Sequence, residues 1–147
     1  KAIKAGPWGG NGGILWDTGI VDSFIKFKVY YGDEIDGLDI TYIQNRTIKT
    51  LRVGGPPPVS NEITLDEDEN FTSITGYFKP MLGTDIFITQ LTLTTDKDRN
   101  VSAGNETGNP FSLTLEEGGH IVGFWGLVGQ SIVAVEAIAV YCSLADS

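Results

Sequence analysis

The sequence predicts an all-β fold, and two features of its 147 residues carry that prediction. Apolar and polar residues alternate with period two along the chain, which is the spacing of a strand with one buried face, and no helical period is visible. Nineteen glycines are more than a helical protein of this size tolerates, because each glycine costs backbone entropy inside a regular element. The glycines therefore indicate many tight turns between short strands.

Five segments carry the strand pattern most clearly. Apolar residues alternate with polar ones in Ile25–Val29, Leu38–Tyr42 and Phe111–Leu115. Ile86–Thr95 is rich in β-branched residues, which suit a pleated surface. Ser131–Cys142 is apolar on both faces and is predicted to be a strand that is covered on both sides. Several short strands separated by turns indicate a sandwich, a barrel or a prism.

Glycine-rich turns recur along the chain, and each precedes a strand-like segment. They lie at Gly9–Gly13, Gly54–Pro58 and Gly104–Gly108. Their similar spacing suggests three diverged copies of one structural unit. Since no linker or shift in composition interrupts the chain, residues 1–147 are predicted to form a single domain.

The charge of the chain excludes several kinds of partner. A formal net charge of −9 disfavours nucleic acid and anionic membrane surfaces, because both bind basic faces. No apolar run is long enough for membrane insertion, and the first residues lack the apolar middle of a signal peptide. Cys142 is the single cysteine, so it is predicted to be a buried thiol and not part of a disulfide, zinc or redox site.

Four segments together resemble the jacalin-related lectin family, and they occur along the chain in the order of that family. These segments are Gly6–Gly13 followed by Trp16-Asp17, Gly108–Leu113, Ile121–Gly126 and Glu136–Tyr141. The resemblance implies a β-prism I fold, in which three four-stranded antiparallel sheets are related by pseudo-threefold symmetry. The first turn is continuous with the N-terminal segment, as in the mannose/glucose-preferring branch and unlike the galactose-preferring branch.

The resemblance also implies a sugar site. In the family, the last glycine of the first turn donates its N–H, and here that residue is Gly13. A second loop with the pattern Gly-x-x-x-Asp adds two backbone N–H groups and a carboxylate, which can accept two hydroxyl protons. Aligned on the closing strand, the carboxylate is Glu136 and the N–H groups are those of Ala134 and Val135, in a loop three residues longer than the pattern.

An alignment without that insertion gives a different result. The position of the family's Asp then falls on Val133, and no carboxylate remains. We favour the alignment on Glu136, because it restores the match of the closing strand.

A second sugar site occurs in some relatives and is implied here by Asp36, Asp39 and Gly55. The prolines that follow Gly55 carry no N–H to donate, which weakens that prediction. In the third turn, Asn100–Gly104 replaces the family's Tyr-Gly-Pro-Phe-Gly, so a third site is not expected.

Other conspicuous residues are given structural roles. Asp66–Glu69 lacks the spacing of a calcium loop and is predicted to be a solvated turn, so we expect neither a metal nor another cofactor. The tryptophans and His120 are predicted to be core aromatics and a strand-entry residue; the tryptophans are Trp8, Trp16 and Trp125.

Four N-glycosylation sequons exceed the number expected by chance. Their asparagines are Asn45, Asn70, Asn100 and Asn105. This excess favours a secreted or vacuolar protein slightly over a nucleocytoplasmic one.

The sequence thus predicts a lectin that binds mannose- or glucose-type glycans without metal or catalysis, as a homodimer or homotetramer. The alternative is an interaction or storage module that kept the fold and lost sugar binding. A glycosidase with Asp36 and Asp39 as its carboxyl pair is disfavoured, because residues three apart on a strand point to opposite faces.

Overall fold

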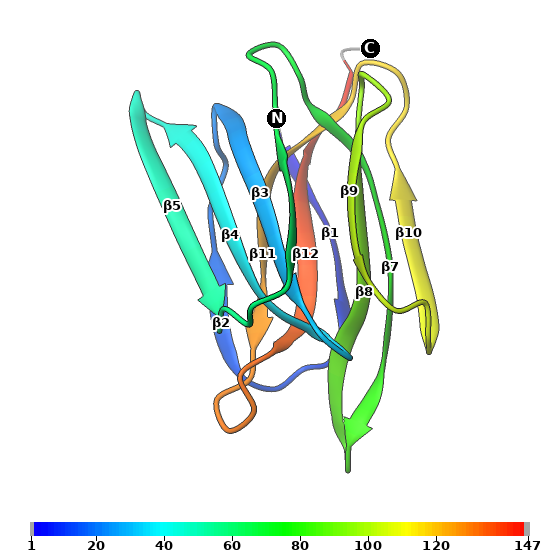
Figure 1. The fold of residues 1–147 in the computed structure, drawn as a ribbon. Coiled ribbons are helices and arrows are strands. Elements are labelled where there is room, and N and C mark those ends of the chain that lie inside the picture. The colour runs from blue at the N-terminus through cyan, green and yellow to red at the C-terminus, as the bar shows by residue number, and fades with distance from the viewer. Residues whose placement is uncertain (1, 146–147) are drawn as a thin grey trace.

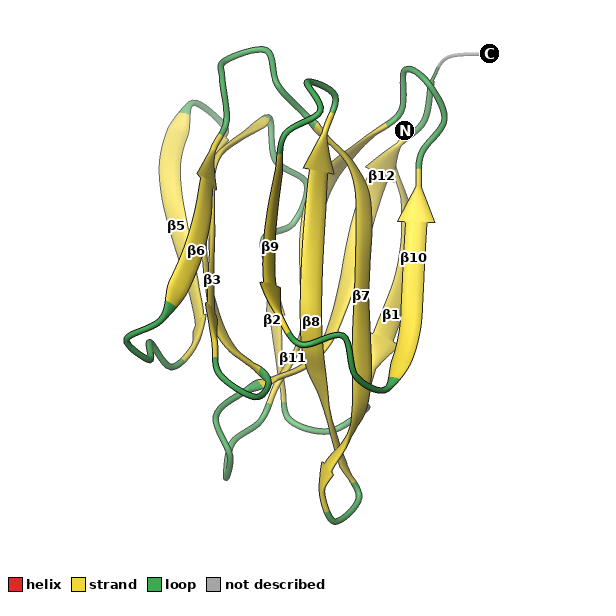
Figure 2. Cartoon of the chain, turned by 45° about the vertical axis from the view of Figure 1, so that its right-hand side comes forward, coloured by secondary structure: helices red, strands yellow, loops and turns green. Residues whose placement is uncertain are grey.

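The computed structural model describes residues 2–145, which form twelve β-strands and no helix (Figure 1). The strands make three antiparallel four-stranded sheets, which confirms the predicted architecture. Figure 2 shows the sheets as the walls of a prism, with loops gathered at its two ends. The described residues contain no helix that could cross a membrane.

The sheets are defined here by their strands in spatial order. The first sheet unites the two ends of the chain and contains β1 (Ala2–Gly9), β12 (Val135–Ser143), β11 (His120–Val128) and β2 (Ile14–Asp17). The second sheet contains β5 (Thr47–Gly54), β4 (Ile35–Gln44), β3 (Ser23–Tyr31) and β6 (Ser60–Thr64). The third sheet contains β10 (Asn109–Thr114), β7 (Phe71–Leu82), β8 (Asp85–Thr95) and β9 (Asn100–Gly104).

Each sheet repeats one Greek-key order. A hairpin supplies two central strands, a third strand lies beside the second, and a fourth returns to lie beside the first. The glycine-rich turns occupy equivalent places, since each joins the third strand of its sheet to the fourth. This shared topology accounts for the repeated turns in the sequence.

The glycine that opens each turn packs against the backbone of the second strand of its sheet. Gly9, Gly54 and Gly104 all have positive φ, and Cβ atoms on them would lie 2.3, 2.2 and 2.2 Å from the carbonyl oxygens of Glu136, Asp36 and Thr89, respectively. No side chain fits at such distances. Glu136, Asp36 and Thr89 are therefore equivalent positions of the three sheets.

Phenylalanine rings from all three sheets meet in the core. Phe24, Phe27, Phe71 and Phe124 contact one another with ring centroids between 5.0 and 6.1 Å apart, mostly in tilted or edge-on geometry. Burying each such side chain stabilises the fold by about 1.5–3 kcal/mol. These contacts hold the three sheets together, and the loops lie at the two ends of the prism.

Two sequence-based predictions were wrong in part. The strand expected from Ser131 begins only at Val135, because Ser131–Ala134 form a loop closed by the Gly129 N–H, which donates to the Ala134 carbonyl at 2.9 Å. The expected solvated turn Asp66–Glu69 has a buried end, since the Glu69 side chain is 0% exposed. Cys142 is buried and His120 opens β11, both as predicted.

Candidate functional site

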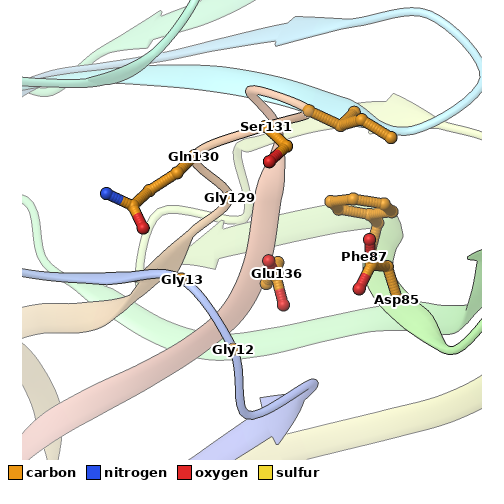
Figure 3. A pocket seen from close by; sticks show the side chains of 9 residues that line it. Gly12, Gly13, Asp85, Phe87, Gly129, Gln130, Ser131 and Glu136 are labelled. Atoms are coloured by element: carbon orange, nitrogen blue, oxygen red, sulfur yellow. The ribbon is translucent and has the colours of Figure 1, made fainter.

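The first glycine turn lies against β12 through its backbone. The Gly10 N–H donates to the Glu136 carbonyl at 2.8 Å, which continues the pairing of β1 with β12 beyond the end of β1. The Glu136 side chain projects from the second residue of β12 toward Gly12 (Figure 3). The turn and the carboxylate are thus held by the same strand pairing.

The Glu136 carboxylate is enclosed by glycines. A Cβ on Gly12 would lie 3.1 Å from Oε1, and a Cβ on Gly129 would lie 3.1 Å from Oε2. The residue is only 7% exposed, and no ion pair to it occurs among the described residues. A buried carboxylate without a cation costs stability, so Glu136 is a candidate for a role in binding.

Burial raises the pKa of Glu136, and the nearby charge of Asp85 raises it further. A hydrogen bond from the Gly12 backbone acts in the opposite direction. The pKa of Glu136 therefore lies above its ordinary value, because the protein stabilises the carboxylate less than water does.

A cavity of about 180 Å³ opens in front of this carboxylate. Gly12 and Gly13 form one side, Gly129–Ile132 of the β11–β12 loop form another, and Asp85 and Phe87 of β8 complete it. A second cavity of about 200 Å³ adjoins it on the side of Asn11 and shares Gly12, Asp85 and Glu136. The size and the many backbone donors suit one small polar ligand better than a large apolar one.

The structure brings together only part of the residue set inferred from the sequence. Gly13 and Glu136 line the cavity, whereas Ala134 and Val135 are buried and do not. Their place along the rim is taken by Gln130 and Ser131. Val133, the carboxylate position of the alternative alignment, is 50% exposed and points toward the second turn, with Cγ1 3.9 Å from where a Cβ of Gly55 would lie.

The second sheet repeats the arrangement around Asp36. The Gly55 N–H donates to the Asp36 carbonyl at 3.2 Å, as Gly10 does to Glu136. A Cβ on Gly32 would lie 3.3 Å from the Asp36 carboxylate, so Gly32 corresponds to Gly129. Residues 32–36 also match the Gly-x-x-x-Asp pattern, a match that the sequence-based prediction did not include.

Burial raises the pKa of Asp36 to about 7, and a hydrogen bond that protonated Asp36 donates to Glu34 and the charges of Glu34 and Asp33 are further causes. Asp36 therefore carries its full charge only above neutral pH.

Asp39 is separated from Asp36 in its contacts. The Tyr30 hydroxyl donates to Asp39 Oδ2 at 2.7 Å, and Arg52 pairs with the same oxygen at 3.1 Å. Asp39, Arg52 and Gly55 line a small cavity of about 60 Å³ that does not include Asp36. The pairing of Asp36 with Asp39 that a second site or a glycosidase was expected to use is therefore not seen.

The third sheet lacks the acidic group. Its equivalent residue is Thr89, whose hydroxyl donates to the Thr107 carbonyl at 2.7 Å. The Asn105 N–H donates to the Thr89 carbonyl at 2.9 Å, so the backbone arrangement is kept without a carboxylate.

The tryptophans do not line the cavities at the glycine turns. Trp16 is buried, Trp8 stacks on Phe111 with centroids 5.1 Å apart, and Trp125 lies under the Lys4 ammonium. The aromatic residue at the cavity is Phe87, which the sequence did not single out.

The asparagines of the sequons differ in accessibility. Asn45, Asn100 and Asn105 are exposed, and Asn45 lies in the β4–β5 turn. Asn70 is half-buried, and its Nδ2 donates to Asp96 at 3.3 Å. Asn70 is therefore the least accessible of these acceptors.

Comparison with known proteins gives a consistent result along the chain. Residues 5–141 match the model of the jacalin-like lectin domain. Jacalin-related lectin 19 of Arabidopsis thaliana is 37% identical over 134 residues, which cover 86% of this chain and 74% of that protein. Horcolin of Hordeum vulgare is 32% identical over 139 residues, which cover 92% of this chain and 94% of that protein.

Solved structures of similar fold are lectins. A Malaysian banana lectin superposes with a TM-score of 0.87 at 34% identity, covering 98% of this chain and 99% of that chain. A mannose-specific jacalin-related lectin from Morus nigra, in complex with mannose, gives a TM-score of 0.82 at 33% identity, covering 98% and 96% of the two chains. The likeness therefore spans nearly the whole length of both chains.

Proposed function

The chain belongs to the jacalin-related lectin family, and from that premise we propose that it binds mannose- or glucose-type glycans at the cavity in front of Glu136. Binding uses neither metal nor catalysis. We also propose that residues 1–147 act as one lectin domain.

One observation carries the proposal. Glu136 is a buried carboxylate with no cation beside it among the described residues, and it faces a cavity bordered by glycine backbone. Sugar hydroxyls are proton donors that a carboxylate can accept two at a time, and the backbone amides of a glycine turn supply donors for the sugar oxygens. Glycine also lets the backbone approach a sugar ring closely.

The donors are assigned to the residues that line the cavity. Gly13 keeps the role inferred from the family, while Gln130 and Ser131 replace Ala134 and Val135 as the contribution of the β11–β12 loop. The longer glutamate side chain is accommodated because its carboxylate lies back against Gly12 and Gly129.

Asp36 is proposed as the carboxylate of a second, weaker site. It shares its backbone arrangement with Glu136, but the turn beside it continues into Pro56–Pro58, which cannot donate. Two sites at one end of the prism, multiplied in a homodimer or homotetramer, would give avidity. A single monosaccharide site of about millimolar Kd supplies only about −4 kcal/mol.

The alternative function is an interaction or storage module without sugar binding. Val133 on the longer loop, exposed beside Gly55, favours that alternative, since it presents an apolar side chain between the two proposed sites. Binding experiments separate the two functions directly.

The test is titration of the ¹⁵N-labelled protein with methyl α-mannoside, followed by NMR and calorimetry. We expect shifts of the Gly12, Gly13 and Gln130 amides. Glu136→Ala should lower the affinity about tenfold or more, because a hydrogen bond to a charged group contributes roughly 1.5–3 kcal/mol. If neither mannose, glucose nor a glycan array gives binding, the protein is a module of the alternative kind.

A further inference from the structure

A second carboxylate faces the proposed sugar cavity from another sheet. Asp85 begins β8 of the third sheet, and Glu136 belongs to β12 of the first, yet both line the cavity of about 180 Å³ and its neighbour of about 200 Å³. Figure 3 shows Glu136 between the Gly12–Gly13 turn and Asp85, with Phe87 beside Asp85. The sequence does not indicate that these two residues lie close together, because they are far apart along the chain.

No positive side chain offsets these two charges. The residues lining both cavities include no Lys, Arg or His, and neither carboxylate has an ion pair in the part of the chain that the structure describes. Burial raises the pKa of Glu136, and repulsion from the Asp85 charge raises it further. Glu136 is only 7% exposed and points into the cavity, so a ligand must satisfy it there.

The hydroxyls of a neutral hexose could donate hydrogen bonds to these carboxylates, but the second negative charge would remain uncompensated. An ammonium group has three donors and a full positive charge, and its hydrogen bonds to carboxylates are about twice as strong as neutral ones. A bare metal ion is a poorer occupant, since no group of three or more His, Cys, Asp or Glu side chains that could hold one occurs among the described residues.

We propose that this cavity prefers sugars that carry a protonated amine, with the ammonium held between Asp85 and Glu136 and the ring hydroxyls held by the glycine turn. The proposal rests on the function proposed above, since the same cavity must bind a sugar ring. It adds a ligand class, the amino sugars, and it predicts that uronic and sialic acids are rejected.

The experiment compares methyl α-mannoside with its 6-amino-6-deoxy and 2-amino-2-deoxy derivatives and with the neutral 2-acetamido sugar, by calorimetry at about pH 7, where an alkyl amine keeps its proton. We expect at least one amine to bind about tenfold more tightly than mannoside. The advantage should shrink in high salt, because part of it comes from exposed Asp85. Simple ethanolamine should not compete, since it lacks the ring.

The decisive variant is Asp85→Asn, which changes an exposed residue at the start of β8 and leaves Glu136 in place. It should lower the affinity for the amine about tenfold more than it changes the affinity for methyl α-mannoside, so that the preference for the amine is lost. Equal binding of amine and mannoside by the parent protein would overturn the proposal and leave the lectin function intact. Absence of binding to every sugar would overturn both.

Discussion

Gly12 lies beside the carboxylate of Glu136. A Cβ at position 12 would lie 3.1 Å from Oε1. Gly12 does not have a positive φ, so its backbone conformation is open to other residues. Glycine is therefore favoured there by the space beside the carboxylate and not by the turn.

Gly12→Ala should accordingly weaken sugar binding without weakening the fold. The added methyl displaces the carboxylate and narrows both cavities, so the affinity for methyl α-mannoside should fall about tenfold. The free energy of unfolding should change by less than about 0.5 kcal/mol, as for an exposed site away from the core. Calorimetric titration and urea unfolding of the same sample check both statements. Unchanged affinity would mean that the ligand binds elsewhere.

Gly13→Ala should behave differently. Gly13 has φ +95°, and a Cβ there would lie 2.3 Å from the Val128 carbonyl oxygen. A non-glycine residue in this region costs about 1–3 kcal/mol, before any clash is counted. Urea unfolding should therefore show a loss of stability of that size, in contrast to Gly12→Ala. Equal stability of the two variants would contradict the distinction between a glycine needed for space and one needed for φ.

Glu136→Gln should separate stability from binding. Because the pKa of Glu136 is raised on folding, its contribution to stability is present at low pH and is lost as the pH rises through the folded-state pKa. The variant should therefore have a higher Tm than the parent at pH 8, and a smaller difference in acid. Sugar binding has the opposite dependence, since it needs the carboxylate. Thermal scans and titrations at several pH values measure both, and a lower Tm for the variant at pH 8 would refute this explanation.

The fold could be predicted from local patterns. Strands such as the one that contains Ile25–Val29 leave a period-two pattern in the sequence, and the three turns leave clusters of glycine. Both signals come from neighbouring residues, so they can be recognised without knowledge of distant contacts. The first and last residues of the strands were harder to predict. The start of β12 is set by the hydrogen bond from Gly129 to Ala134, while the apolar run continues outside the strand.

The site could be predicted only in part. Gly13 and Glu136 were predicted from the family pattern. Asp85 and Phe87 belong to another sheet and line the cavity only because the fold brings that sheet beside the first one. Asp36 was predicted together with Asp39 and Gly55; the symmetry keeps Gly55 beside Asp36 and adds Gly32, whereas Asp39 has other partners. Aligning the three repeats on Gly9, Gly54 and Gly104 would have revealed that correspondence.

Asp36→Asn should remove a pH-dependent loss of stability. The pKa of Asp36 is raised to about 7 by burial and by Glu34 and Asp33. Its stabilising contribution is complete below the ordinary pKa of 3.8 and is lost as the pH rises through about 7. The variant should gain Tm relative to the parent between pH 5 and pH 8. Thr89→Ser, at the equivalent uncharged position, is the control and should show no such pH-dependent gain.

The Glu69 carboxylate, which lies just before β7 of the third sheet, accepts hydrogen bonds from several donors. Arg99 binds both of its oxygens at 3.0 Å, the Thr95 hydroxyl donates at 2.6 Å, and the Asp66 N–H donates at 2.9 Å. Burial alone would raise the pKa of Glu69, but these donors outweigh burial and hold the pKa below its ordinary value. The turn that the sequence marked as solvated is thus anchored from inside.

Arg99→Ala should destabilise the protein by about 2–3 kcal/mol, because it leaves a buried carboxylate without its cation. The figure is below that of a fully buried pair, since the Arg99 side chain is 44% exposed. Lys97→Ala is the matched control: Lys97 pairs with the exposed Asp66 and Asp68, and such surface pairs contribute little. The parent's advantage over Arg99→Ala should be present at neutral pH and disappear as the pH falls through the lowered pKa of Glu69, where the carboxyl becomes neutral. Urea unfolding from pH 7 to acid measures this, and a difference that did not change with pH would show that Arg99 stabilises the turn through packing and not through its charge.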